Sequence, residues 1–233
     1  MATIVEHAYP IQIPVNHVQL DGDLIIPEHA HGLVLFAHGS GSSRHSSRNR
    51  YVATELRQAG LATLLMDLLT RREEQVDART GHLRFDINLL ADRLVAAAGY
   101  LALDPRTMNF PIGVFGASTG GGAALVAAAR KPQLVRAVVS RGGRPDLAED
   151  ALPRVRCPAL LIVGGEDDVV LELNRDAMAR MRSDVELKII PGATHLFEEQ
   201  GALEQIAHMA AEFFNRHLQH QQDKLVLDGL DPQ

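Results

Sequence analysis

A serine between small residues is the feature of the sequence that points most directly to chemistry. The apolar run IGVFGA leads into Ser118, and the alanine-rich run TGGGAALVAAAR follows it. A strand, a tight G-x-S-x-G turn and a helix in this order hold a serine hydroxyl in strained backbone geometry at the edge of a sheet. Small residues are needed on both sides because larger side chains would collide with the adjoining strand or helix. The pattern therefore predicts that Ser118 is a nucleophile.

The glycines around Ser118 could also hold a phosphate group, but their spacing argues against it. Phosphate-binding loops carry G-x-x-x-x-G-K-[ST] or G-x-G-x-x-G, and this segment has neither the lysine nor the second spacing. The start of the following helix suits an oxyanion instead, because its first N–H groups are free and carry the positive end of the helix dipole. We expect the Thr119 amide to be one donor of an oxyanion hole.

A second glycine-rich segment, HGSG, follows the apolar run LVLFA and could supply the other donor. Loops that leave parallel strands gather at the carboxyl edge of a sheet, and glycine lets the main chain approach a substrate closely. We expect the Ser40 amide to complete the oxyanion hole. His38 could be taken for a base, but we interpret it as a support that holds this loop by hydrogen bonding, because the base of such a site comes later in the chain.

An acid and a base follow the serine in the order that such a site requires. In enzymes with this elbow the chain order is nucleophile, acid, base. The run ALLIVG leads into the consecutive carboxylates Glu166, Asp167 and Asp168, and VELKII leads into His195. The base takes the proton of Ser118, and the carboxylate fixes the imidazole tautomer. We predict His195 as the base and Asp167 as the acid, with Asp168 as the alternative acid.

Two arginines offer an indication of the substrate. Arg141 and Arg144 lie in SRGGRPD, which leaves the strand after the elbow at the same edge of the sheet. A guanidinium binds a carboxylate through two parallel hydrogen bonds, so these arginines could hold an acidic group of a substrate. The alternative is that they pair with Asp146, with Glu149 or with the loop backbone.

The elements that must position these residues alternate between short apolar runs and longer helical segments after residue 30, which predicts parallel strands joined by crossover helices. The N-terminal segment differs: IQIPVNHVQL, a turn at Asp21-Gly22 and DLIIP predict an antiparallel hairpin at the sheet edge. We interpret the charged stretch LTRREEQVDARTG as a solvated surface loop. Parallel strands are predicted at 33–38, 62–67, 112–117, 135–140, 159–164 and 185–190.

The composition is that of one α/β domain, which we expect over residues 1–220, with 221–233 as a C-terminal extension. The chain has 233 residues, a formal charge of -6 and 46% hydrophobic residues. It has no long basic run, so nucleic acid is not an expected partner. Cys157 is the only cysteine, which excludes an intramolecular disulfide and a cysteine-based metal cluster. No signal peptide or membrane span is recognisable, so we expect a cytoplasmic protein that does not bind membranes.

The chain resembles the dienelactone hydrolase branch of the α/β-hydrolase superfamily over about residues 17–217. The resemblance rests on LVLFAHGSGSSRHSSRNRYVA, GLATLLMDLLT, FGASTGGGAALVAAA, VVSRGGRPDL, LLIVGGEDDVV and PGATHLFEE. It implies an α/β-hydrolase fold with a mostly parallel, eight-stranded sheet, helices on both faces and a minimal cap. It also implies hydrolysis of small esters or lactones without a metal or an organic cofactor. True dienelactone hydrolases carry a cysteine at the elbow, where this chain has Ser118, and we interpret Cys157 as a small buried residue.

The combined prediction is a serine hydrolase that cleaves small carboxylic esters or lactones through an acyl-enzyme, as a monomer or a homodimer. Two alternatives stay open. The first is a protein of the same fold that binds a small ligand or a partner without catalysis, which is possible because fold does not dictate function. The second is an acyltransferase that uses Ser118, His195 and Asp167 with an acceptor other than water. The complete set of three residues argues against the first alternative.

Overall fold

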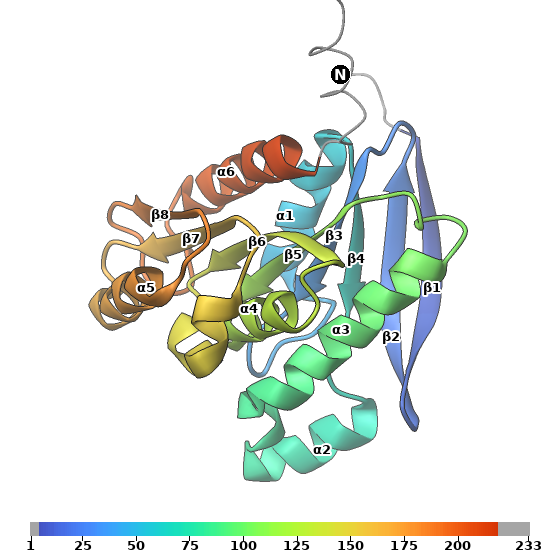
Figure 1. Cartoon of the computed structure of the whole chain (residues 1–233), viewed down its shortest axis with the longest axis horizontal. Coiled ribbons are helices and arrows are strands. Elements are labelled where there is room, and N and C mark those ends of the chain that lie inside the picture. Colours follow the sequence, from blue (N-terminus) through green and yellow to red (C-terminus); the bar gives the residue numbers. More distant parts are fainter. Residues whose placement is uncertain (1–4, 219–233) are drawn as a thin grey trace, which may run out of the picture.

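The computed structural model describes residues 5–218 and shows one eight-stranded sheet covered by helices on both faces (Figure 1). The strands are β1 (Glu6–Val15), β2 (Val18–Pro27), β3 (Gly32–Ala37), β4 (Leu61–Met66), β5 (Ile112–Ala117), β6 (Val135–Arg141), β7 (Ala159–Gly164) and β8 (Val185–Ile190). Their order across the sheet is β1-β2-β4-β3-β5-β6-β7-β8. β1 and β2 pair antiparallel, β2 pairs antiparallel with β4, and the other neighbours are parallel.

Helices form a layer on each face of the sheet (Figure 1). They are α1 (Ser47–Gln58), α2 (Arg71–Thr80), α3 (Ile87–Leu103), α4 (Thr119–Arg130), α5 (Asp168–Arg180) and α6 (Ala202–His217), with short 3-10 segments η1 (Leu83–Phe85) and η2 (Pro145–Arg154). One hydrophobic core packs α3 and α4 against the sheet, and a second packs α1 and α6 against the opposite face. Every residue of β3, β4, β5 and β7 is buried, because helices cover these strands on both sides.

The bounds of the parallel strands agree with the predicted ranges to within one residue at each end. Short apolar runs that suit burial on both faces were a sufficient signal for them.

The loops after β3, β5, β7 and β8 all leave the carboxyl edge of the same sheet, and this arrangement matters for function. Ser40, Ser118, Asp167 and His195 follow these four strands, so residues far apart in the sequence meet at one edge.

The N-terminal hairpin is confirmed, but the predicted position of its turn is wrong. The chain turns at Asn16-His17, where Asn16 has a φ of 51°. Asparagine enters this left-handed region more readily than most residues. Asp21 and Gly22 lie inside β2 instead, and a Cβ on Gly22 would come within 2.9 Å of the Leu64 side chain. The glycine therefore serves close packing within the sheet rather than a turn.

The charged stretch after β4 is also not the loop that the sequence suggested, because most of it forms α2. The Thr70 side chain accepts a hydrogen bond from the Glu73 amide, and the Glu73 carboxylate accepts one from the Thr70 amide. This capping box satisfies two amides that the first helical turn would otherwise leave without partners. Arg93 of α3 forms an ion pair with Glu73 and ties α2 to the domain. The spacing T-R-R-E was the signal that the loop interpretation overlooked.

The most apolar runs of the sequence are internal elements of the domain. LATLLM is β4, in which every residue is buried, and AALVAAA lies in α4, where all of its residues except Ala129 are buried. No helix within residues 5–218 is long and apolar enough to cross a membrane. The extension predicted at 221–233 lies outside the described residues.

Candidate active site

The turn between β5 and α4 holds Ser118 in the strained backbone conformation that the sequence pattern predicted. Ser118 has φ 51° and ψ -121°, a region that residues with side chains rarely adopt. Its amide donates to the Arg141 carbonyl at 3.2 Å, and its carbonyl accepts from the amides of Gly121 and Arg144, both at 3.0 Å. These bonds to α4 and to the end of β6 maintain the strain. Ser118 lines a cavity at the carboxyl edge of the sheet.

Glycines around the elbow are required by close contacts. A Cβ on Gly116 would overlap the Gly120 carbonyl, and a Cβ on Gly120 would overlap the Ala37 carbonyl at the end of β3. A Cβ on Gly39 would lie 3.0 Å from the Cβ of Ser118. The loop after β3 therefore rests directly on the elbow. A larger residue at Gly120 or Gly39 would displace one from the other, and a larger residue at Gly116 would push β5 away from the start of α4.

His195 and Asp167 form a hydrogen-bonded pair at the same edge. Nδ1 of His195 lies 2.6 Å from Oδ2 of Asp167, and an ionised carboxylate can only accept, so Nδ1 donates. The other imidazole nitrogen is free to serve the cavity that His195 shares with Ser118. The side chains of Ser118 and His195 form no direct hydrogen bond in this structure. Hydrogen bonds between a nucleophile and its base are often long before a substrate binds. Asp167 is thus the predicted acid that reaches the imidazole, whereas Glu166 and Asp168 are exposed.

A carboxylate that the sequence interpretation missed braces the histidine loop. Glu199 accepts hydrogen bonds from the Thr194 amide at 3.0 Å and from the Thr194 hydroxyl at 2.6 Å. The bond from this hydroxyl is the main cause that lowers the pKa of Glu199. Gly142 lies close to the same loop, since a Cβ there would lie 3.6 Å from Cε1 of His195. Glu199 therefore fixes the residue that precedes His195, although nothing in a regular element would indicate this contact.

His38 supports the loop that carries Ser40, as expected. Its Nε2 accepts a hydrogen bond from the Leu68 amide at 3.0 Å, so the neutral ring donates from Nδ1 to the Gly39 carbonyl at 2.9 Å. Burial lowers the pKa of His38, which favours this neutral form. Both ring nitrogens are therefore engaged, which leaves neither free to act as a base.

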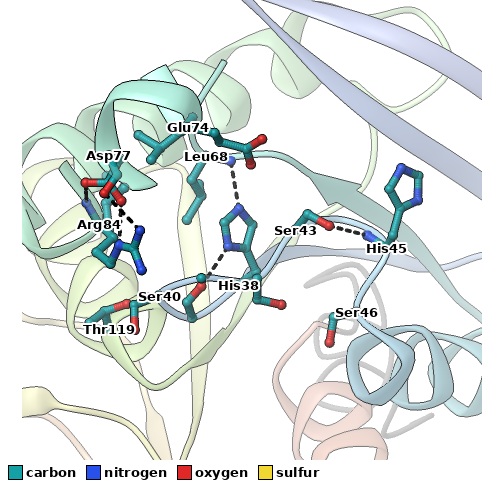
Figure 2. A pocket seen from close by; sticks show the side chains of 15 residues that line it. His38, Ser40, Ser43, His45, Ser46, Leu68, Glu74, Asp77, Arg84 and Thr119 are labelled. Carbon is teal, nitrogen blue, oxygen red and sulfur yellow. Dashed lines mark hydrogen bonds and ion pairs between the residues drawn. The ribbon is translucent and has the colours of Figure 1, made fainter. Parts of the chain in front are cut away.

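Two cavities meet at Ser40. The small pocket has a volume of about 200 Å³ and is lined by Ser118, His195 and Arg141, with α1 and the loop after β3 closing it. The large cleft has a volume of about 530 Å³ and extends from Ser40 and Thr119 towards α2 and η1 (Figure 2). Of the two residues predicted to carry oxyanion donors, Ser40 lines both cavities and Thr119 lines only the large cleft.

The far wall of the large cleft comes from the segment that was predicted as a loop. Glu74 and Asp77 of α2 and Arg84 of η1 face the loop after β3 across the cleft (Figure 2). Arg84 and Asp77 form an ion pair, and the Asp77 carboxylate also accepts hydrogen bonds from the amides of Leu83 and Arg84. The pair therefore joins α2 to η1. These residues were missed because the helix that presents them was not recognised.

The two arginines predicted near the substrate lie in different surroundings. Arg144 forms two hydrogen bonds with Asp146, at 2.9 and 2.7 Å, and lines neither cavity. This is the pairing that the sequence left open as the alternative. Arg141 is only 8% exposed and lines the small pocket, and its Nη1 has no hydrogen-bond partner within the described part of the chain.

Cys157 is buried before β7 and lines neither cavity. Burial raises the pKa of its thiol to about 11, so the nucleophilic thiolate is disfavoured. The interpretation of Cys157 as a small buried residue is confirmed. Across residues 5–218, no group of three or more His, Cys, Asp or Glu side chains is arranged to hold a metal ion.

A mostly parallel sheet of this order, with a serine elbow and a histidine–carboxylate pair at its carboxyl edge, defines the α/β-hydrolase fold. The chain belongs to the dienelactone hydrolase family, whose model matches residues 20–223. The crystal structure of dienelactone hydrolase from Anabaena variabilis is 59% identical, with a TM-score of 0.90. That similarity covers 92% of this chain and 99% of the other.

Two proteins of Mycobacterium tuberculosis, from strains CDC 1551 / Oshkosh and H37Rv, are 58% identical over 208 residues, or 89% of this chain. Both carry the name "Putative phosphoribosyl transferase". The chain spans 46% of their length, so more than half of each lies outside the match. Est1E from Butyrivibrio proteoclasticus shares the fold at 18% identity and a TM-score of 0.74, over 89% of this chain and 98% of that one.

Proposed function

We propose that the protein is a serine hydrolase that cleaves small carboxylic esters or lactones through an acyl-enzyme. The observation that carries the proposal is the 2.6 Å contact between His195 Nδ1 and Asp167 Oδ2 at a cavity shared with the strained Ser118. A carboxylate on Nδ1 leaves Nε2 able to take a proton. The strain at Ser118 is accounted for if its hydroxyl has to be presented to a substrate.

In the proposed reaction, Ser118 Oγ attacks the carbonyl carbon while His195 Nε2 takes the hydroxyl proton. The amides of Ser40 and Thr119 donate hydrogen bonds to the tetrahedral oxyanion. The imidazolium, stabilised by Asp167, then gives its proton to the departing alkoxide, and the C–O bond of the ester breaks. Water attacks the acyl-enzyme with His195 again as the base, which releases the acid and restores the serine.

The related proteins support the choice of ester or lactone chemistry. The Anabaena relative is named a dienelactone hydrolase, and Est1E has been solved with ferulic acid, an aromatic carboxylic acid, bound. The elbow carries Ser118 where true dienelactone hydrolases carry a cysteine, so dienelactone itself is not our proposed substrate. We do not extend the phosphoribosyl transferase name to this chain, because it belongs to proteins more than twice the length of the match.

The test uses a fluorophosphonate probe and short p-nitrophenyl esters. We expect labelling and turnover with the wild type and with Ser183→Ala, which changes a serine that lines neither cavity, but not with Ser118→Ala. Labelling of Ser118→Ala would identify another nucleophile. A folded wild type that is neither labelled nor active would favour a ligand-binding protein. If added alcohols capture the acyl group in preference to water, the protein is an acyltransferase.

A further inference from the structure

The first turn of α1 carries a buried asparagine whose side chain does not cap the helix. Asn49 is 2% exposed, and its Oδ1 is buried without a hydrogen-bond partner among the described residues. In a capping box, the side chain at this position accepts a hydrogen bond from the amide of the cap residue. Here the cap residue is Ser46, and its amide donates to the Ser43 carbonyl at 3.0 Å instead.

The equivalent residue of α2 shows what such a side chain does when it serves its helix. Glu73, three residues after the cap Thr70, accepts a hydrogen bond from the Thr70 amide at 2.7 Å. A leucine could fill the space of Asn49 without the cost of burying an unpaired amide oxygen. The polar side chain of Asn49 is therefore explained better by a partner that enters the pocket it lines than by a need of the fold.

A second group in the same small pocket is also unpaired. Arg141 ends β6 and is 8% exposed, and its Nη1 makes no hydrogen bond to any residue from 5 to 218. The pocket of about 200 Å³ thus presents an acceptor, Asn49 Oδ1, and a donor, Arg141 Nη1, in the space that Ser118 and His195 also line. A partner that both donates and accepts would satisfy both groups, and water is the smallest such partner.

The proposed reaction requires water on the side of the acyl group that faces His195. The imidazole gives a proton to the departing alkoxide and later takes one from water, so the two oxygens occupy nearly the same place. His195 lines the small pocket and not the large cleft, whereas Thr119, which carries an oxyanion donor, lines only the large cleft. The acyl chain therefore has its room in the large cleft, and water takes the place of the alcohol in the small pocket.

We propose that Asn49 and Arg141 hold the water molecule that hydrolyses the acyl-enzyme. Water has two hydrogens and two lone pairs, and the site has a use for each. One hydrogen is donated to Asn49 Oδ1 and the other to His195 Nε2. One lone pair accepts from Arg141 Nη1, and the other attacks the carbonyl carbon. The inference rests on the proposed function and specifies how the site selects water as the acceptor of the acyl group.

The step distinguishes water from an alcohol. The water oxygen bonds to the carbonyl carbon while His195 takes one proton; the bond from that carbon to Ser118 Oγ then breaks, and the imidazolium returns the proton to Oγ. The second hydrogen of the water remains on the product acid and can stay bonded to Asn49. An alcohol has a single hydroxyl hydrogen, which His195 takes, so it has none to donate to Asn49.

The test measures how the acyl-enzyme divides between water and methanol. With p-nitrophenyl butyrate and a fixed concentration of methanol, the products are butyric acid and methyl butyrate, which gas chromatography separates. Asn49→Leu keeps the size of the side chain and removes the acceptor. We expect it to raise the ratio of methyl ester to acid about 10-fold, the effect of one hydrogen bond. Asn49→Asp, which keeps an acceptor oxygen, should stay within about threefold of the wild-type ratio.

Stopped-flow release of p-nitrophenol separates the two halves of the reaction. Because p-nitrophenoxide leaves readily, we expect deacylation to limit turnover. In Asn49→Leu the rate of the initial burst, which reports acylation, should change less than about twofold, while kcat in water falls about 10-fold. The value of kcat/KM, which reports acylation, should be kept, so KM falls with kcat. A purely structural role would alter both halves, because both use Ser118 and His195.

Two further variants separate the contributions. Arg141→Met should slow transfer to water and to methanol alike and change the product ratio less than about twofold, because either oxygen can accept from the guanidinium. Asn88→Leu is the matched control, since Asn88 is an exposed asparagine in the first turn of α3 that lines neither cavity. It should keep the wild-type rates and ratio. If Asn49→Leu does not fold, Asn49→Ala should raise the ratio in its place.

The inference and the proposed function fail in different ways. An unchanged product ratio in a folded Asn49→Leu or Asn49→Ala, or an equal loss of acylation and deacylation, would overturn the inference and leave the serine hydrolase intact. A rise in the ratio that Asn88→Leu reproduces would also overturn the inference. A wild type that the fluorophosphonate probe does not label would instead overturn the proposed function.

Discussion

Arg84 in the large cleft and Arg141 in the small pocket are both arginines on the wall of a cavity next to Ser40, but their surroundings differ. Arg84 is neutralised by Asp77, and the same carboxylate binds two backbone amides. Arg141 is more deeply buried and has a guanidinium nitrogen without a partner. A charge satisfied within the chain orders local structure, whereas an unsatisfied one is available to a ligand. The comparison therefore distinguishes an arginine that braces the wall of the site from an arginine whose guanidinium nitrogen is unpaired among the described residues.

The largest effect is expected where both cavities depend on one group. Asp167→Asn should lower kcat by about 10⁴-fold for short and bulky esters alike, because asparagine no longer holds the reactive imidazole tautomer. Steady-state kinetics with both kinds of ester would measure it. Asp168→Asn, which alters an exposed carboxylate one residue away, should change kcat less than about twofold. A greater loss of kcat in Asp168→Asn than in Asp167→Asn would show that Asp168 is the acid and would contradict the prediction for Asp167.

A smaller effect is expected at the wall that the cavities share. Gly39→Ala would push the loop after β3 away from Ser118 and displace the Ser40 amide, and the loss of one oxyanion donor costs about 10²-fold in kcat. KM should change little, for either kind of ester. Gly99→Ala is the control, because a Cβ there meets no atom within 4 Å. A rise in KM with an unchanged kcat would show that the loop binds the substrate rather than the oxyanion.

A change confined to the large cleft should be smaller again. Thr70→Ala removes the cap of α2 and should destabilise the protein by about 1 kcal/mol, measured by urea unfolding. Esters bulky enough to reach α2 should show a KM raised by at most about fivefold, and short esters should not. Thr80→Ala, at the exposed end of the same helix, is the control. Equal effects on short and bulky esters would contradict the division between the two cavities.

The smallest effect concerns pH and His38. Burial puts its folded-state pKa below the ordinary 6.5, so its contribution to stability is fully present above pH 6.5 and is lost as the pH falls through the folded-state pKa. One such group adds a slope of at most about 1.4 kcal/mol per pH unit. Thermal unfolding between pH 7 and 5 should show a shallower decline for His38→Gln than for the wild type. His208→Gln, with a largely exposed ring, should follow the wild type, and parallel curves for all three would refute the role given to His38.

Local patterns were sufficient for much of the fold and for the residues of the candidate site. The apolar runs before Ser118, Asp167 and His195 predicted buried strands, and these strands are present. Local signals failed where two of them competed. Asp21-Gly22 has the composition of a turn but lies inside β2, and the charges of the α2 segment concealed the capping box at Thr70.

The sequence by itself determined that a serine, a carboxylate and a histidine follow separate strands in the order a hydrolase needs. Parallel strands end at a common edge, so the order along the chain already implies proximity. Only the tertiary structure decided that Asp167 rather than Asp168 reaches His195, and that Arg144 is paired while Arg141 is not. Neighbours in a turn point in different directions, and their partners come from distant segments. The partner of each charge therefore depends on the packing of the whole domain.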